Sequence, residues 1–497
     1  MASWLRRRQN HRTRRQALLV CAAILAGACA VGPDYKRPAA PQPAAFKELP
    51  GEDSTLAAEW KAAQPQDAQL RGKWWEAFGD PALNTLEEQA GTANQSVLQA
   101  DAQFRAARAA VRAIRADLFP TVTAGASATR TRVSSNRATV QRATAASAAT
   151  GTFVDYQLPI DLSYEADVWG RVRRNIEAGV ATARASAADL QAVLLSVQAE
   201  LAVDYFALHG SDADRRLLDA TVTAYEQALQ LTTNRFNQGV ASGSDVEQAR
   251  TQLATTRAQA TEIDVARSQY EHAIAILAGK PPSDLTIPSA PLATTPPAIP
   301  LELPSALVER RPDVAAAERR VAAANAQIGV AKSAFFPTVS LGLQGGFESS
   351  TLAKLLTWPS HFWSIGPALA ETVFDAGRRH ALTDQAVANY DADVAAYREN
   401  VLTAFQDVED NLATLRVLAD EATQQDEAVA SAERSLALAN NRYVAGVAAY
   451  LEVITAQSAL LANERTSVEI LTRRMTASVL LIKALGGGWS TAALPRD

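Results

Sequence analysis

The chain carries one sequence pattern twice, at a constant spacing of 207 residues. Residues 234–241 read Asn-Arg-Phe-Asn-Gln-Gly-Val-Ala, and residues 441–448 read Asn-Arg-Tyr-Val-Ala-Gly-Val-Ala. Other identities keep this offset: Leu229/Leu436, Leu231/Leu438, Val246/Val453, Ala249/Ala456, Leu253/Leu460 and Gly279/Gly486. A Phe-Pro-Thr-Val pair at 119 and 336 is 217 residues apart, so we expect a length difference in a loop. A repeat of this size decides architecture before any local motif does, and it predicts two like halves that share one structure.

The composition is that of an ordinary water-compatible chain. Charged residues make up 20% and the mean hydropathy is −0.09. Outside the N-terminus there is no run of 18 apolar residues, which argues against helical membrane spans. Alanine is abundant and aromatic residues are few, a balance that favours closely packed long helices.

Residues 1–28 read as a secretory signal, with six arginines before a short apolar stretch at 17–28. The stretch ends in Ala-Gly-Ala before Cys29, which resembles a bacterial lipoprotein cleavage site. The leucine usually found three places before the cysteine is Leu25, four places before it. We expect diacylglycerol and palmitate on Cys29. The alternative is ordinary cleavage nearby that leaves Cys29 as a free thiol.

Export also fits the cysteines and the charge. Cys21 leaves with the signal and Cys29 would be acylated, so the mature chain has no thiol for redox or thiol–metal chemistry. Removing residues 1–28 takes away six arginines and no acid, which lowers the formal charge from −5 by six, to −11. An acidic chain disfavours nucleic acid as a partner.

Helix, strand, strand and helix follow one another in each half. Apolar spacing predicts a helix over 83–118 that Pro120 stops. Strict alternation of apolar and polar residues predicts strands at 154–164 and 339–348, and weaker patterns predict 121–131 and 362–373. Each pair encloses a polar or Gly/Ser-containing loop, at 132–152 and 348–361.

Long proline-free tracts follow the strands. Residues 170–235 and 377–442 are each 66 residues long, which corresponds to helices of about 100 Å. Gly210 is a candidate kink. Returning helices are expected at 244–278 and 450–485, after glycine-capped turns. A proline-rich linker follows at 280–304, and the Arg-Arg-Pro-Asp sequence at 310–313 reads as the start of another helix.

Four amphipathic strands cannot close a membrane barrel, whose minimum is about eight. Because an open edge in lipid leaves backbone groups unpaired, further copies of the chain must complete the barrel. An obligate oligomer follows from this closure, although its copy number does not.

Several motifs, in order along the mature chain, resemble the TolC family of outer-membrane efflux channels, in its NodT/OprM-type lipoprotein branch. They are Cys-Ala-Val-Gly-Pro-Asp-Tyr-Lys-Arg-Pro from 29, Trp-Trp-Glu-Ala-Phe-Gly-Asp-Pro from 74, Asp-Val-Trp-Gly-Arg-Val-Arg-Arg from 167, Leu-Pro-Ser from 303, Arg-Arg-Pro-Asp from 310, Phe-Asp-Ala-Gly-Arg-Arg from 374 and the two Gly-Val-Ala turns. The resemblance implies a mainly α chain with a small transmembrane β-barrel. The channel would be a homotrimer, an α-barrel joined to a β-barrel and built from two internal repeats per chain.

The expected organisation follows from this resemblance. It comprises a signal peptide at 1–28, an N-terminal arm or equatorial segment at 29–82 and a first repeat at 83–280. A linker or second equatorial segment at 281–304, a second repeat at 305–486 and a tail at 487–497 complete it. The protein would lie in the outer membrane, anchored by its lipid, with the helical barrel in the periplasm.

The resemblance also implies a passive conduit for small toxic compounds. Its partners would be a periplasmic membrane-fusion adaptor, an inner-membrane pump of RND or related type and outer-membrane lipid. Two alternatives remain open: the outlet of a type I protein secretion system, and a soluble periplasmic coiled-coil scaffold, against which the amphipathic strands argue. The five histidines lack metal spacing and no phosphate loop or nucleophile elbow occurs, so we expect no enzyme, no metal and no cofactor beyond the lipid.

The repeated turns are the candidate site. In the family they form the closed tip and contact the adaptor, which predicts docking through Gly239, Val240, Ala241, Gly446, Val447 and Ala448. The other interpretation is that the glycines only cap helices. Family tips carry inward acids, and the nearest residues here are Asp245 and Glu452, which are either a pore constriction or solvated helix-end carboxylates. Arg235 and Arg442 are either latches of the closed state or charges that complement helix dipoles.

Overall fold

The computed structural model describes residues 30–48 except 42 and 44, then 72–132, 152–292, 296–297, 299 and 310–489. Predictions for the signal segment, Cys29, most of the 132–152 loop, most of 293–304 and the last eight residues lie outside these ranges. The chain forms two compact units, each drawn from both repeats. One comprises Met1–Arg37, Ala106–Ala183 and Arg320–Val394, and the other comprises Pro38–Arg105, Arg184–Arg319 and Ala395–Asp497.

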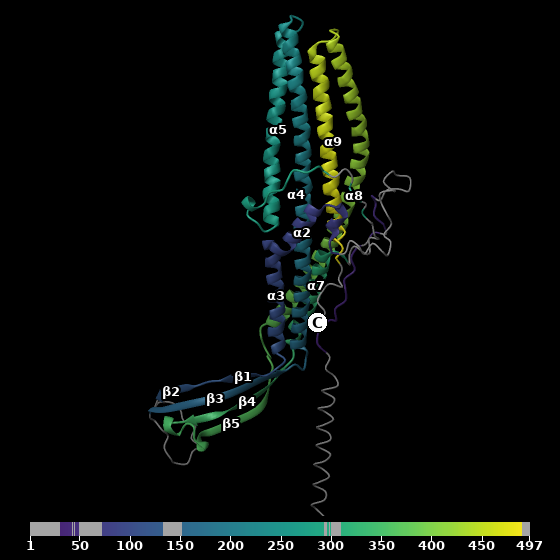
Figure 1. The fold of residues 1–497 in the computed structure, drawn as a ribbon. Helices are drawn as coiled ribbons and strands as arrows, with labels where there is room; N and C mark the ends of the chain where they lie inside the picture. The colour runs from purple at the N-terminus through teal and green to yellow at the C-terminus, as the bar shows by residue number, and fades with distance from the viewer. Residues whose placement is uncertain are drawn as a thin grey trace, which may run out of the picture. The chain divides into compact units, whose positions relative to one another are not determined.

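The first unit holds a five-stranded antiparallel sheet (Figure 1). Its strands are β1 (Thr121–Ala124), β2 (Ser127–Arg132), β3 (Thr152–Ala166), β4 (Thr338–Ser349) and β5 (His361–Ala370). β1 and β2 pair with one edge of β3, and β4 lies between β3 and β5. Strands predicted from strict alternation therefore fall within β3 and β4, and strands from the two repeats meet in one sheet.

The single strand predicted for 121–131 is wrong, because the structure divides it into β1 and β2. The register of both strands places Gly125 opposite Pro159 of β3. Gly125 N–H donates to the Pro159 carbonyl at 3.0 Å, but Pro159 has no N–H to return. The ladder is interrupted at that point, so proline explains the break.

Each strand-to-helix junction is capped by an aspartate from a motif noted in the sequence. Asp167 accepts hydrogen bonds from the backbone N–H of Val172 and Arg173, at 3.0 and 2.9 Å. Asp375 accepts from Arg379, through its backbone N–H at 3.2 Å and its Nε at 2.7 Å. A carboxylate at the first turn of a helix also complements the helix dipole. These contacts explain why both junctions carry an aspartate before arginines.

The residues that follow Cys29 are seated against this first unit. Val31 N–H donates to the Trp169 carbonyl at 3.0 Å, and Arg174 pairs with Asp34 at 3.0 Å. Gly32 lies so close to Gly329 that a Cβ would approach the Gly329 Cα to 2.5 Å. We call residues 30–34 the N-terminal seat. It fixes the chain at the junction of strands and helices.

The long helix and the returning helix of the second repeat have the same lengths as those of the first repeat. The long helices α4 (Arg171–Asn237) and α8 (Arg378–Val444) have 67 residues each, and the returning helices α5 (Gly243–Leu277) and α9 (Tyr450–Ala484) have 35 each. These four helices confirm the sequence predictions to within two residues at each end. By length and composition α4 could cross a membrane, but half of the apolar window is buried inside the protein.

α4 continues as a helix through Gly210. A Cβ at Gly210 would approach the Thr472 hydroxyl oxygen of α9 to 2.5 Å. Glycine at this position therefore allows the close approach of two helices, and the predicted kink stays a prediction.

The helix predicted over 83–118 is two helices, α2 (Pro81–Ala93) and α3 (Gln95–Ala116). Asn94 separates them, because its Oδ1 accepts from the N–H of Ser96 and Val97 while its Nδ2 donates to the Leu277 carbonyl. The predicted helix start at 310–313 is confirmed by α7 (Pro312–Ser333).

Candidate functional site

The first turn, between α4 and α5, is built by a glycine in the left-handed conformation. Gly239 has φ +76° and its N–H donates to the Phe236 carbonyl at 2.9 Å. Val240 N–H donates to the Arg235 carbonyl at 2.8 Å. This pair of bonds is the Schellman motif, which satisfies the carbonyls that the end of α4 leaves open. A Cβ on Gly239 would meet no atom within 4 Å, so the backbone angle rather than space requires glycine.

The second turn, between α8 and α9, repeats this backbone bond for bond. Gly446 has φ +78°, its N–H donates to the Tyr443 carbonyl at 3.0 Å, and Val447 N–H donates to the Arg442 carbonyl at 3.0 Å. The two Gly-Val-Ala sequences thus produce the same helix ending. The structure confirms the left-handed glycine caps that the sequence predicted.

The start of the returning helix differs between the turns. Ser242 and Asp245 form a capping box on α5, in which each side chain accepts from the other residue's backbone N–H, at 3.2 and 3.0 Å. α9 begins after Ala449, which provides no side-chain cap. Its acid, Glu452, instead pairs with Arg442 at 3.0 Å, and both side chains are about half exposed.

The two hairpins contact each other at their turns. The Arg235 guanidinium of α4 lies 4.7 Å from the centre of the Tyr443 ring and donates to the Val444 carbonyl at 3.3 Å. Tyr443 and Tyr450 are buried, with ring centres 5.1 Å apart. Burial raises the pKa of Tyr450, and a hydrogen bond with Thr232 of α4 opposes that shift. Arg235 therefore reaches the second hairpin, whereas Arg442 pairs within its own hairpin.

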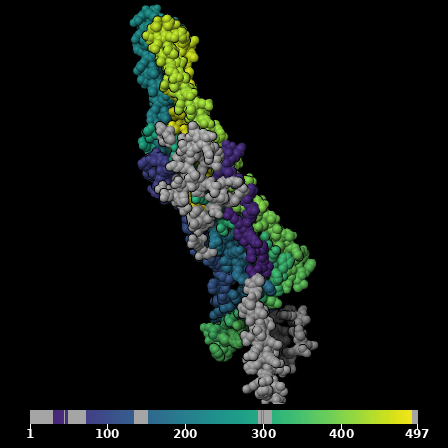
Figure 2. All heavy atoms as spheres, turned by 90° about the vertical axis from the view of Figure 1, so that its right-hand side faces the viewer, coloured from purple at the N-terminus to yellow at the C-terminus, as the bar shows by residue number. Residues whose placement is uncertain are grey.

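Each turn exposes large apolar side chains, beside exposed polar residues such as Asn237 and Gln238 in the first turn. Val240 is 63% exposed and Val447 is 68% exposed, and Phe236 and Leu451 are also exposed. The two turns lie at the same end of their hairpins, as Figure 1 and Figure 2 show. Arg235 joins them through the Val444 carbonyl and the Tyr443 ring.

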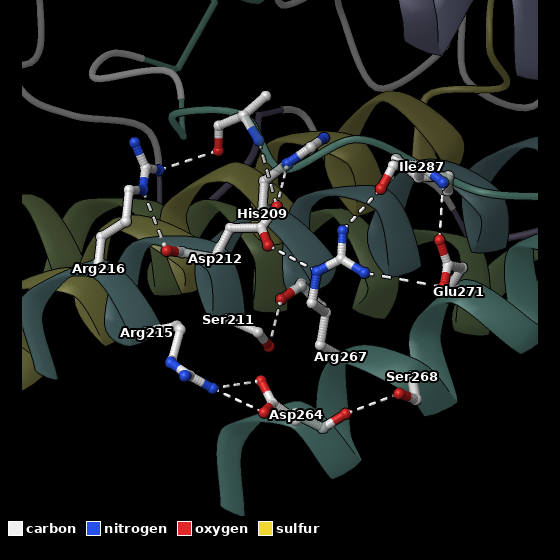
Figure 3. Close-up of polar contacts among 12 residues, drawn as sticks. His209, Ser211, Asp212, Arg215, Arg216, Asp264, Arg267, Ser268, Glu271 and Ile287 are labelled. Carbon is white, nitrogen blue, oxygen red and sulfur yellow. Dashed lines mark hydrogen bonds and ion pairs between the residues drawn. The ribbon is translucent and has the colours of Figure 1, made fainter. Parts of the chain in front are cut away.

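A second polar site fastens the mid-chain linker to the first hairpin (Figure 3). Asp212 of α4 accepts from Arg267 of α5 at 2.7 Å and contacts His209 at 3.0 Å. Arg267 donates to the Ile287 carbonyl at 2.7 Å, and the Ile287 N–H donates to Glu271 at 2.7 Å. Because Asp212 is buried, these partners satisfy its charge. The site anchors the linker, and among the described residues no cluster of acids, histidines and cysteines suited to a metal occurs.

Sequence reasoning missed Tyr443, Tyr450 and the linker site. The two tyrosines had a signal, because they stand where the first repeat has Phe236 and Gly243. Departures from the repeat therefore mark the residues that make the hairpins different. The linker site had no such signal, since its members are scattered along α4, α5 and the linker.

The chain thus combines two long helical hairpins with matching turns and a five-stranded antiparallel sheet. The chain belongs to the outer membrane efflux protein family, whose model matches residues 86–280 and 303–487. It is therefore the outer-membrane channel of a tripartite efflux system, and its helical barrel lies in the periplasm.

Comparisons with individual proteins agree with this assignment. The chain is 32% identical over 473 residues to the probable efflux pump outer membrane protein TtgC of Pseudomonas putida, with 95% of each chain covered. It is 33% identical to the outer membrane protein OprJ of Pseudomonas aeruginosa, again with 95% of each covered. The structure of the outer-membrane channel OprN superposes with a TM-score of 0.83 at 30% identity, covering 93% of this chain and 100% of that one. The MtrE channel of Neisseria gonorrhoeae superposes with a TM-score of 0.77 at 25% identity, covering 93% and 99%.

Proposed function

We propose that three copies of the chain form a passive outlet for small toxic compounds, without catalysis of its own. In this assembly the turns 239–241 and 446–448 dock onto a periplasmic adaptor, which joins the channel to an inner-membrane pump of RND or related type. The observation that carries the proposal is the exposed valine in each turn, Val240 and Val447, on two hairpins that Arg235 joins, because exposed apolar groups are typical of a protein contact.

Trimer formation is supported by the edges of the sheet. In the described sheet β1 and β2 form one edge and β5 forms the other. Backbone groups at such edges have no water to bind within lipid, so a neighbouring copy must pair with them. Three copies of four strand passes, counting β1 and β2 as one, give the twelve-stranded barrel that the family resemblance implies.

Lipid anchoring at Cys29 is supported by the N-terminal seat. Residues 30–34 are fixed where the strands meet the helices, which is the level at which the membrane ends. An acyl chain on Cys29 would therefore start at the inner surface of the outer membrane, within reach of its lipid.

The names of relatives suggest the kind of cargo. Two relatives are described as a toluene efflux protein and an antibiotic efflux protein, both from Pseudomonas putida. We propose apolar toxic compounds of this kind as cargo for the present chain. A type I protein secretion outlet is the alternative, and it would leave solvent and antibiotic tolerance unchanged when the gene is deleted.

The test of docking replaces both turn glycines, in Gly239→Trp and Gly446→Trp. We expect loss of export of toluene and antibiotics, because tryptophan strains the left-handed turn and obstructs the exposed surface of the turns. Normal export with normal channel levels in the outer membrane would overturn the docking role. Leu118→Ala, an exposed residue at the end of α3, is the control and should leave export unchanged.

A further inference from the structure

The sheet sorts its side chains by chemistry between its two faces. In the register of the five strands, one face carries Val122, Ala124, Tyr156, Leu158, Ile160, Leu162, Tyr164, Val339, Leu341, Leu343, Phe347, Trp363, Ile365 and Leu369. All four acids of the described strands, Asp155, Asp161, Glu165 and Glu348, are on the other face. The apolar face is therefore the one toward lipid, and the acidic face is the one toward water.

The height of the apolar band matches a membrane. Along β3 the apolar face continues to Val154, and Tyr156 on that face lies ten residues from Ala166 at the helix junction, roughly 33 Å along the strand. A strand tilt of about 40° reduces this to roughly 25 Å, the height of the apolar band in outer-membrane barrels. Tyr156 therefore marks the level at which hydrocarbon gives way to lipid headgroups.

Two tryptophans accompany the apolar face toward this end of the sheet: Trp363, in register with Ile160, and Trp358 in the loop before β5. Trp363 is 70% exposed, and Trp358 is 81% exposed with its ring stacked on His361 at 5.1 Å. The loop that carries Trp358 is held in shape by the Lys354 carbonyl, which accepts from the hydroxyls of Thr357 and Ser360 at 2.7 and 2.8 Å. Large aromatic residues at a membrane–water boundary are typical interface anchors.

The same face turns basic just beyond Tyr156. Arg130 of β2 lies opposite Val154, and Arg132 lies opposite Thr152, so both extend the apolar face by two and four residues past Tyr156. Both arginines are exposed, and the described strands place no carboxylate on their face. They therefore lie on the order of 5–10 Å beyond the hydrocarbon, at the depth of lipid headgroups.

The strands join the helices at one end of the sheet, and the end of β2, the start of β3 and the β4–β5 connection lie at the other end (Figure 1). Since the helices of this family lie in the periplasm, the basic end faces the exterior. We propose that Arg130 and Arg132, with Trp358 beside the lipid boundary, bind the phosphate groups of an anionic glycolipid in the outer leaflet. Guanidinium groups bind phosphate in bidentate geometry, and continuity with the lipid-facing band favours a lipid over a soluble or protein partner.

The test measures lipid binding to the purified full-length protein by native mass spectrometry. The probes are bisphosphorylated lipid A and the same lipid with its phosphates removed. We expect wild-type protein to bind the phosphorylated form about tenfold more tightly, and Arg130→Ala/Arg132→Ala to abolish this preference. Arg130→Lys/Arg132→Lys should keep part of it, and Trp358→Ala should weaken both lipids equally.

The matched control is Thr129→Ala/Thr131→Ala, on the opposite face of the same strand, which should bind like the wild type. The proposal is overturned if wild-type protein does not distinguish the two lipids, or if the double alanine variant keeps the preference. Displacement of the lipid by an equal concentration of inorganic phosphate would also overturn it, because the site would then recognise free phosphate rather than a lipid.

Discussion

The two turns share one backbone and differ in what holds the helix that follows. Both have a left-handed glycine and the same two Schellman hydrogen bonds. The first returning helix is then fixed by Ser242 and Asp245 within its own first turn. The second has no such cap, and is held by buried Tyr450 and by the exposed pair of Arg442 with Glu452.

Asp245 and Glu452 stand at the starts of the two returning helices, but their carboxylates have different partners. Asp245 accepts a hydrogen bond from the Ser242 backbone in its own turn. Glu452 is half exposed and pairs with Arg442, and water and salt can screen this pair. The acid of the first turn is therefore engaged by backbone, and the acid of the second by a side chain of its own hairpin.

Removing the Tyr450 ring should produce the largest effect. Tyr450→Ala takes a buried aromatic group from the contact between the hairpins, a change that typically costs about 3–5 kcal/mol. We expect faster hydrogen exchange over 443–450 than over 236–243, together with larger conductance in planar bilayers. Tyr450→Phe keeps the ring and should change both far less. Equal exchange at the two turns in Tyr450→Ala would contradict the comparison.

Exchanging the caps should reverse the difference between the helix starts. Ser242→Ala removes a capping box and should destabilise the start of α5 by about 1 kcal/mol. Ala449→Ser places a hydroxyl at the uncapped start of α9 and should stabilise it by a similar amount. Hydrogen exchange at 242–248 and 449–455 measures both changes. If the amides of 242–248 are as protected from exchange in Ser242→Ala as in the wild type, the cap does not stabilise this helix start.

Neutralising Glu452 should affect conduction more than stability. The pair with Arg442 is exposed, so Glu452→Gln should change the free energy of unfolding by less than about 1 kcal/mol. If Glu452 constricts the pore, single-channel conductance should increase and cation preference should fall. Asp245→Gln serves as the contrast, because it should loosen α5 with a smaller change in conductance. A Glu452→Gln channel with wild-type conductance would rule out gating by this acid.

Alkaline pH should lower the stability of the second turn, which contains Tyr450, more than that of the first. Near neutral pH neither turn should be affected. The pKa of Tyr450 is raised in the folded protein, so the folded state keeps a proton that the unfolded state loses above about pH 10. Its contribution to stability is complete below that pH and declines as the pH rises further. Burial raises the pKa of Tyr205 and Tyr225 as well, so absorbance at 295 nm should show one late-titrating tyrosine fewer in Tyr450→Phe than in the wild type. If that variant titrates like the wild type, the shift does not belong to this residue.

The sequence predicted the fold well where a repeat or a strict period carried the information. The four long helices and the strands β3 and β4 have continuous patterns that follow from helix or strand geometry. Predictions failed where one residue decided the outcome. Pro159 divides the strand opposite it, and Asn94 ends a helix by binding backbone. Such effects depend on a partner that is distant in sequence and that a local pattern does not contain.

The candidate site was predicted in the same uneven way. Gly239 and Gly446 could be recognised because they occupy the same position in the two repeats, and a left-handed turn is the ordinary reason for glycine there. The partner of Arg235 is not, since Tyr443 lies on the other hairpin, more than 200 positions away. Charge alone placed Asp245 and Glu452 in one class, and only the hydrogen-bond geometry separates them.

The N-terminal seat imposes an order on biogenesis. Residues 30–34 are made first, yet their partners are Trp169 and Arg174 in the first repeat and Gly329 in the second. Until both repeats have folded, residues 30–34 have only some of their contacts. An acylated N-terminus would then be attached to the membrane without being held at the junction of strands and helices. A chain truncated before α7 would lack Gly329, and residues 30–34 would then have only their contacts with the first repeat.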